Sequence, residues 1–212
     1  MNTPQVPTSH MKALQFAKQF QFFMISLILI SAWPLRALAQ DSHSHTTQQQ
    51  QELTPEQQSQ QTALLKTVRE STARFQDVRM VESEGYRLEF GCVSGPDSGA
   101  MGLHSVNDTL VGNGIVDATR PQIVLYEAQP NGDLKLTGAD DLVLAPPWDA
   151  KHSGKPPELM GQFSHYFESP NRFGLPAFYT LHGWAWKANP NGAFVNWHPH
   201  VSCRSFVGQT TP

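Results

Sequence analysis

Histidine placement is the strongest chemical signal in this sequence. Period-two alternation in the segment FYTLHGWAW puts His182 on the same strand face as Phe178, Thr180, Trp184 and Trp186. Such an aromatic face should be buried. A buried imidazole needs a partner for each ring nitrogen, which can be a carbonyl, a carboxylate, a water molecule or a metal ion.

His104 has a similar setting in the segment GAMGLHSVN, where the glycines allow the backbone to lie close to a neighbouring strand. In PQIVLYE, Glu127 ends a predicted strand and shares its face with Ile123 and Leu125. If these strands are neighbours, His104, His182 and Glu127 form a two-histidine, one-carboxylate group. Such a group suits Zn, Cu, Mn or non-haem Fe, with Zn or Cu expected first. Alternatively, each histidine is a hydrogen-bonded core residue and Glu127 is a solvated carboxylate.

Three further histidines are candidates to complete the metal shell. His198 and His200 flank Pro199, a spacing that can chelate a divalent ion in an extended segment. The same pair follows the turn sequence NPNG, so it could equally belong to a surface loop. His165 lies in the stretch 145–175, which is rich in Pro, Gly and Ser and is expected to be a long loop of functional importance.

Several other site chemistries lack their motifs. The sequence contains no GxSxG elbow, Walker A loop, GxGxxG motif, CxxCH haem site or HExxH pair. Asp140 and Asp141 either alternate across a strand or sit in a turn, so they cannot converge as a glycosidase pair. The sequence therefore does not indicate which reaction, if any, the protein catalyses.

Composition limits the size of the fold and the choice of partner. The chain has 212 residues, 39% hydrophobic and 16% charged, which fits one ordinary domain. Its net charge of −3 provides no broad basic surface, so nucleic acid is not expected as a partner. A metal ion or small molecule is expected instead.

The N-terminal segment has the features of a secretory signal peptide. Lys12 and Lys18 precede the apolar run 22–33, and Ala37-Leu38-Ala39 matches a signal peptidase site, so cleavage is expected after Ala39. The run is shorter than the ~20 residues that span a bilayer, so no stable membrane span is expected after cleavage. Translation could begin at Met1 or Met11. Removal of 1–39 takes away three of 15 basic residues and no acid, leaving 12 against 18 and a charge of −6.

Export affects the interpretation of the two cysteines. An oxidising periplasm or extracellular space favours a disulfide, so we expect Cys92 to pair with Cys203. A redox-active or copper-binding thiolate pair is the alternative, but neither cysteine belongs to a CxxC motif.

The rest of the chain predicts a Gln-rich disordered linker over 40–62 and a single α+β domain over 63–212. Thr54-Pro55-Glu56-Gln57 nevertheless carries a helix start signal, and Asp77 is a candidate cap for a second short helix. Five strands are expected, at residues 87–93, 101–106, 122–127, 134–144 and 178–186. We expect one or two N-terminal helices packed on an antiparallel sheet or partial barrel, closed by one disulfide.

Four segments resemble a family of uncharacterised exported bacterial proteins. They are ARFQDV, GAMGLHSVN, RPQIVLYE and LHGWAWKANPNGAFVNWHPHVSC, which together extend over about residues 73–203. Ser105 stands where a tyrosine is common in that family. The resemblance implies a location in the bacterial envelope and a single folding unit, and it implies no activity.

The sequence thus predicts a periplasmic or secreted protein with a histidine-lined site for a divalent or transition metal. The alternative is a metal-free ligand-binding or structural module of the cell envelope. In that alternative, the histidines satisfy backbone groups and the aromatic residues form a core or a cleft.

Overall fold

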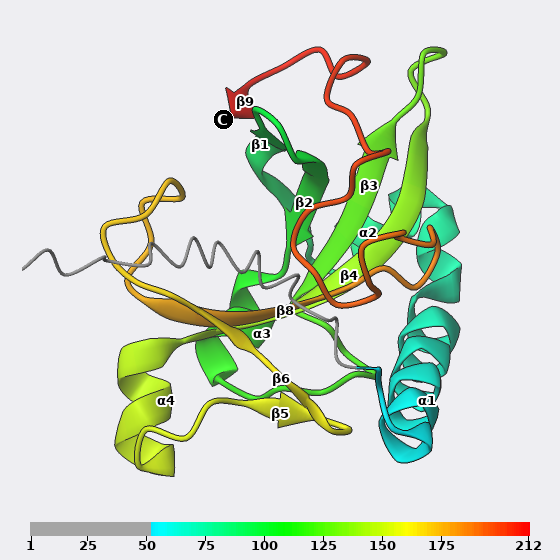
Figure 1. Ribbon diagram of the computed structural model, residues 1–212. Coiled ribbons are helices and arrows are strands. Elements are labelled where there is room, and N and C mark those ends of the chain that lie inside the picture. The colour runs from blue at the N-terminus through cyan, green and yellow to red at the C-terminus, as the bar shows by residue number, and fades with distance from the viewer. Residues whose placement is uncertain (1–51) are drawn as a thin grey trace, which may run out of the picture. The chain divides into compact units, whose positions relative to one another are not determined.

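The computed structural model describes residues 52–212 (Figure 1). The expected signal peptide, 1–39, and most of the expected linker, 40–62, lie outside these residues. Within the described part, no helix is both long and apolar enough to cross a membrane.

Two helices joined by a short 3-10 turn begin the described chain. Helix α1, Pro55–Thr72, starts inside the range assigned to the linker, and its first turn carries a complete capping box between Thr54 and Gln57. The turn η1, Ala73–Gln76, leads to α2, Val78–Ser83, which Asp77 caps through the amide of Arg79. Both helices therefore begin at residues whose side chains satisfy free backbone amides.

Seven strands form one sheet in the order β7-β8-β4-β3-β2-β1-β9. They are β1 Arg87–Gly95, β2 Gly99–Val106, β3 Ile123–Ala128, β4 Leu134–Leu144, β7 His165–Phe167, β8 Phe178–Gly183 and β9 Thr210–Thr211. The expected sheet was purely antiparallel, but the observed one is mixed, because β9 pairs parallel with β1. The five predicted strands are all present, although β8 ends at Gly183 rather than at Trp186.

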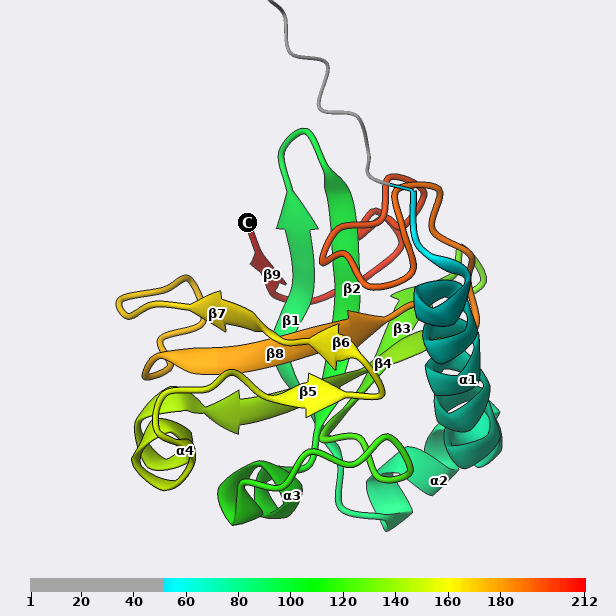
Figure 2. The ribbon, with the colours of Figure 1, turned by 60° about the horizontal axis from the view of Figure 1, so that its bottom comes forward.

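The sheet is strongly curled, so that β1 and β2 run across the direction of β4 and β8 (Figures 1 and 2). Bulges accompany this curl: pairing shifts between Glu89 and Cys92 in β1 and between Leu125 and Tyr126 in β3. Close backbone approaches contribute as well. A Cβ atom at Gly102 would collide with the carbonyl of Tyr126. The resulting half-barrel has a concave face that can bring distant strands together.

The segment between β4 and β8 is more ordered than expected. Instead of one long loop, it contains α4, Ala145–His152, and a hairpin of β5, Glu158–Leu159, and β6, Gln162–Phe163, followed by β7. Prolines suit the first turn of α4. The N–H groups of a first turn have no partner within the helix, so the missing N–H of proline costs nothing there. The longest irregular stretch that remains in this segment is residues 168–177, between β7 and β8.

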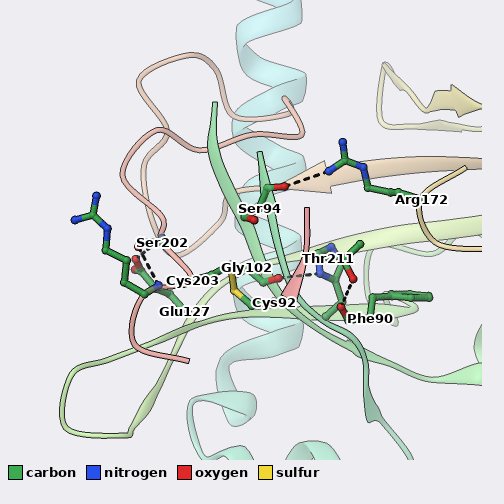
Figure 3. The surroundings of a disulfide bond; sticks show 11 residues. Phe90, Cys92, Ser94, Gly102, Glu127, Arg172, Ser202, Cys203 and Thr211 are labelled. Carbon is green, nitrogen blue, oxygen red and sulfur yellow. Dashed lines mark hydrogen bonds between the residues drawn. A yellow bond between two sulfur atoms is a disulfide. The ribbon is translucent and has the colours of Figure 1, made fainter. Parts of the chain in front are cut away.

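A disulfide between Cys92 of β1 and Cys203 holds the C-terminal segment against the sheet, as the sequence predicted (Figure 3). The two Cα atoms are 5.7 Å apart, and the bridge closes a separation of 111 residues. Beyond it, the amide of Cys92 donates to the carbonyl of Gln209, where β9 joins the sheet edge. The bridge therefore fixes the last ten residues beside β1.

Candidate metal centre

Three buried side chains from three strands meet inside the curl of the sheet: His104 of β2, Asp140 of β4 and His182 of β8. We call them the triad. Each offers one ligand atom, and these atoms lie within 4.8 Å of one another. The exposed fractions of the side chains are 4%, 2% and 3%, respectively. The triad is therefore a group of potential ligands removed from bulk water.

Strand register and curl place the triad. Asp140 lies directly opposite His182 in the β4–β8 pair, so both side chains leave the same face. His104 is three strands from His182 in the sheet order, which corresponds to about 14 Å in a flat sheet. The imidazole centroids are nevertheless only 5.5 Å apart. The half-barrel shape is what makes the convergence possible.

The ring of His104 is oriented by its own strand. Its Nδ1 lies 3.2 Å from the carbonyl oxygen of Gly102. A carbonyl can only accept a hydrogen bond, so Nδ1 must carry the proton and Nε2 is left with a lone pair. An N–H directed at a backbone carbonyl is the usual way in which proteins fix a metal-binding histidine.

Asp140 is held in the same manner. The hydroxyl of Thr180, the next residue of β8 on this face, donates to Asp140 Oδ1 over 2.5 Å. That bond leaves Oδ2 directed toward His182, whose Nδ1 is 3.1 Å away. Carboxylate ligands of metals are commonly hydrogen-bonded through their other oxygen in this way.

His182 is the exceptional member, because both of its ring nitrogens are buried without a hydrogen-bond partner in the structure. The approach of Nδ1 to Asp140 is close but does not have the angles of a hydrogen bond. Leaving a buried polar group unpaired costs about 1–3 kcal/mol. The 3.1 Å between His182 Nδ1 and Asp140 Oδ2 is also a common distance between two atoms that bind the same metal ion through bonds of about 2.1 Å.

The protonation states suit cation binding. Burial lowers the pKa of His104 to about 3, with His182 adding to the effect, and burial lowers the pKa of His182 to about 3 as well. Burial raises the pKa of Asp140 to about 7, against the opposing hydrogen bonds from Thr180 and Leu181. At neutral pH the imidazoles are therefore neutral with free lone pairs, and a cation has to displace at most one proton, from Asp140.

Of the six expected ligands, the structure brings only His104 and His182 together. Glu127 was wrongly placed in this group: its carboxylate binds Lys187 Nζ at 2.6 Å and the amide of Ser202 at 3.1 Å. It occupies the far end of β3, opposite Lys135 rather than beside the triad. The face of β3 that carries Glu127 was predicted correctly, but Glu127 lies too far along the strand to reach the triad.

The other three expected ligands also lie elsewhere. His198 uses both nitrogens within the C-terminal segment, donating from Nε2 to the carbonyl of Ala188 and accepting at Nδ1 from the amide of His200. His200 is exposed, and His165 contacts the carbonyl of Phe194. The expectation that one of these residues completes the shell with His104 and His182 is therefore not met.

Asp140 is the residue that sequence reasoning missed. Of the two arrangements expected for this acid pair, the structure shows alternation across a strand, with Asp141 accepting from the amide of Asp117. An acid within the otherwise apolar run of β4 was an available signal. Without the β4–β8 register, however, nothing in the sequence connects Asp140 to His182.

Comparison of the chain with models of protein families, with curated proteins and with solved structures finds no match. The functional assignment therefore depends on the geometry of the triad.

Proposed function

We propose that the protein binds one transition-metal ion through His104, Asp140 and His182. The observation that carries the proposal is the buried His182 ring, whose two nitrogens have no hydrogen-bond partner although a carboxylate oxygen lies 3.1 Å away. Two imidazoles and one carboxylate suit Zn²⁺ or Cu²⁺, and such a set leaves at least one coordination position open.

The fit requires only small movements. Ligand atoms around a tetrahedral ion with bonds near 2.1 Å are about 3.4 Å apart. All three ligand atoms lie within 4.8 Å of one another, so the side chains must draw together by at most about 1.4 Å. The hydrogen bonds to Gly102 and Thr180 limit this adjustment to small changes of side-chain torsion.

Two properties of the mature protein accompany the proposal. We infer from the signal-like sequence at 1–39 and from the resemblance to exported bacterial proteins that the chain acts in the bacterial envelope. An oxidising compartment would also keep Cys92 and Cys203 joined, so that neither thiolate competes for the ion. The chemistry of an open metal position would be Lewis-acid or redox chemistry.

The test is reconstitution of protein purified without a His tag. After treatment with a chelator, the protein is incubated with Zn²⁺ or Cu²⁺, desalted and analysed for metal content. One equivalent is expected for the wild type and none for His104→Ala or His182→Ala. His152→Ala is the matched control and should retain the full equivalent, because His152 is exposed and its ring contacts the carbonyl of Trp148 in α4. Folded wild-type protein that retains neither metal would refute the proposal and favour a metal-free module.

A further inference from the structure

The triad faces an apolar cavity of about 20 Å³, which is enough for about one water molecule. Four phenylalanine rings contribute to its wall. Phe167 and Phe178 are stacked with centroids 5.0 Å apart, and Phe173 meets Phe178 edge-on at 5.9 Å. An open coordination position of the proposed ion would therefore point toward hydrocarbon.

A second and larger cavity adjoins the first. Its volume is about 210 Å³, and it shares Phe90, Ile123, Leu142 and Leu175 with the cavity at the triad. For comparison, an apolar cavity of about 150 Å³ in another protein is sufficient for benzene. By volume, the cavity at the triad fits a single donor atom, and the larger cavity that shares its wall fits a phenyl-sized body.

Phe90 lines both cavities and has an unusual backbone conformation. Its φ angle is 62° in the β1 bulge, a left-handed conformation that non-glycine residues rarely adopt. Its ring meets Phe173 at 5.3 Å. Opposite, the loop 168–177 is attached to β1 by a hydrogen bond from Arg172 to the carbonyl of Ser94 (Figure 3). The pocket therefore has walls from the sheet, from the bulge and from this loop.

Charge selects the kind of molecule that fits. A divalent ion with one carboxylate ligand carries a net charge of +1, and the surrounding hydrocarbon cannot neutralise it. A monoanionic donor would do so. The larger cavity also has two acidic side chains in its lining, Glu89 and Asp108, both exposed, which would repel a second negative charge at the far end of a ligand.

From these observations we infer that the protein binds a small organic monoanion with an apolar body, such as an aryl or alkyl monocarboxylate. The carboxylate binds the metal ion at the triad, and the apolar body lies between Phe90, Leu142 and Leu175. This inference rests on the proposed metal site and adds the class of molecule that the site recognises.

Co²⁺-loaded protein provides the test, because its visible absorption reports both the ion and any added ligand. The loaded protein is titrated with acetate, benzoate and terephthalate. Benzoate should bind at least tenfold more tightly than acetate, because only benzoate fills the larger cavity. Terephthalate should bind more weakly than benzoate, because its second carboxylate would lie near Glu89 and Asp108.

A variant that fills the larger cavity makes the test specific. Val111 of α3, Asp108–Asn113, lines the larger cavity but not the triad cavity. Val111→Phe should reduce benzoate affinity at least tenfold and leave the Co²⁺ spectrum and acetate affinity unchanged, which also shows that the variant is folded. Ile115→Phe, at an exposed position outside both cavities, is the matched control and should behave as the wild type.

The outcomes separate the two proposals. If the wild-type protein develops no Co²⁺ spectrum and also retains neither Zn²⁺ nor Cu²⁺ in the reconstitution above, the metal site itself is refuted, and the ligand inference with it. If Co²⁺ binds but acetate and benzoate have equal affinities, or Val111→Phe does not alter benzoate binding, the metal site stands and the ligand inference is overturned.

Discussion

His182 and His198 are histidines with nearly the same burial, and they differ in the hydrogen bonds of their ring nitrogens. Their rings lie 5.9 Å and 4.8 Å, respectively, from the ring of Trp184. Both nitrogens of His198 are hydrogen-bonded to backbone groups, whereas neither nitrogen of His182 is. A turn-rich segment supplies polar backbone groups to His198, whereas His182 lies within strand β8, opposite Asp140 of β4. Burial alone therefore does not distinguish the two histidines, whereas the unpaired ring nitrogens of His182 do.

The largest expected effect is on metal affinity when the two histidines are exchanged for alanine separately. His182→Ala should lower the affinity for Zn²⁺ at least about 100-fold, because loss of a ligand should exceed the 10–100-fold effect typical of an outer-shell partner. His198→Ala should leave affinity unchanged but destabilise the fold by about 1–3 kcal/mol, because it leaves backbone groups unpaired. Calorimetric titration and urea unfolding measure these quantities. Equal metal affinity in the two variants would remove the distinction between the histidines.

Removal of the disulfide should affect the region of His198 rather than the triad. The variant Cys92→Ala/Cys203→Ala should lose about 2–5 kcal/mol of unfolding free energy, since the bridge closes a long loop. Its Zn²⁺ affinity should change by less than about threefold while it remains folded, because pairing of β2, β3, β4 and β8 does not involve the bridge. Urea unfolding and calorimetric titration are the measurements. Loss of metal binding in the folded variant would show that the two regions are coupled.

The pH dependence of metal affinity should reveal a single proton. Asp140 has a pKa raised to about 7, so below that pH an ion must displace its proton, and affinity should fall about tenfold per pH unit between pH 7 and 5. The pKa values of His104 and His182 are lowered to about 3, so they contribute no competing proton in this range. If the ligands were two solvent-exposed histidines instead, a metal ion would have to displace two protons below about pH 6.5. A slope of two in a plot of log affinity against pH would contradict a buried site.

The smallest effect concerns the hydrogen bond that orients Asp140. Thr180→Val should weaken Zn²⁺ binding about tenfold by freeing Asp140 Oδ1. Thr137→Val is the matched control, because Thr137 is an equally buried threonine of β4 whose hydroxyl bonds the carbonyl of Leu125 instead. Its affinity should remain that of the wild type. If both variants lose affinity equally, the effect reports general damage to the sheet.

Local signals in the sequence predict the pieces of this fold well. Alternation and turn residues locate all five main strands, and the two cysteines of a chain with a signal-like N-terminus form the predicted bridge. His104 and His182 were also singled out correctly as residues that converge. The strands could be predicted because alternation is a property of adjacent residues, and the bridge could be predicted because the sequence contains only two cysteines.

The third member of the triad could not be predicted because it depends on pairing. Asp140 joins His182 through the β4–β8 register, and His104 reaches them only because the sheet curls at its bulges. Neither register nor curvature is encoded in the composition of one strand. The hydrogen bonds that satisfy His198 are likewise tertiary, since they come from the backbone conformation at Ala188 and His200.

Anomalous diffraction from crystals of the Zn²⁺- or Cu²⁺-loaded protein tests the central claim most directly. We expect one strong peak at the absorption edge of the metal, within about 2.1 Å of a ring nitrogen of His104, an oxygen of Asp140 and a ring nitrogen of His182. A peak at His198 and His200, or no peak in a crystal of the loaded protein, would contradict the account.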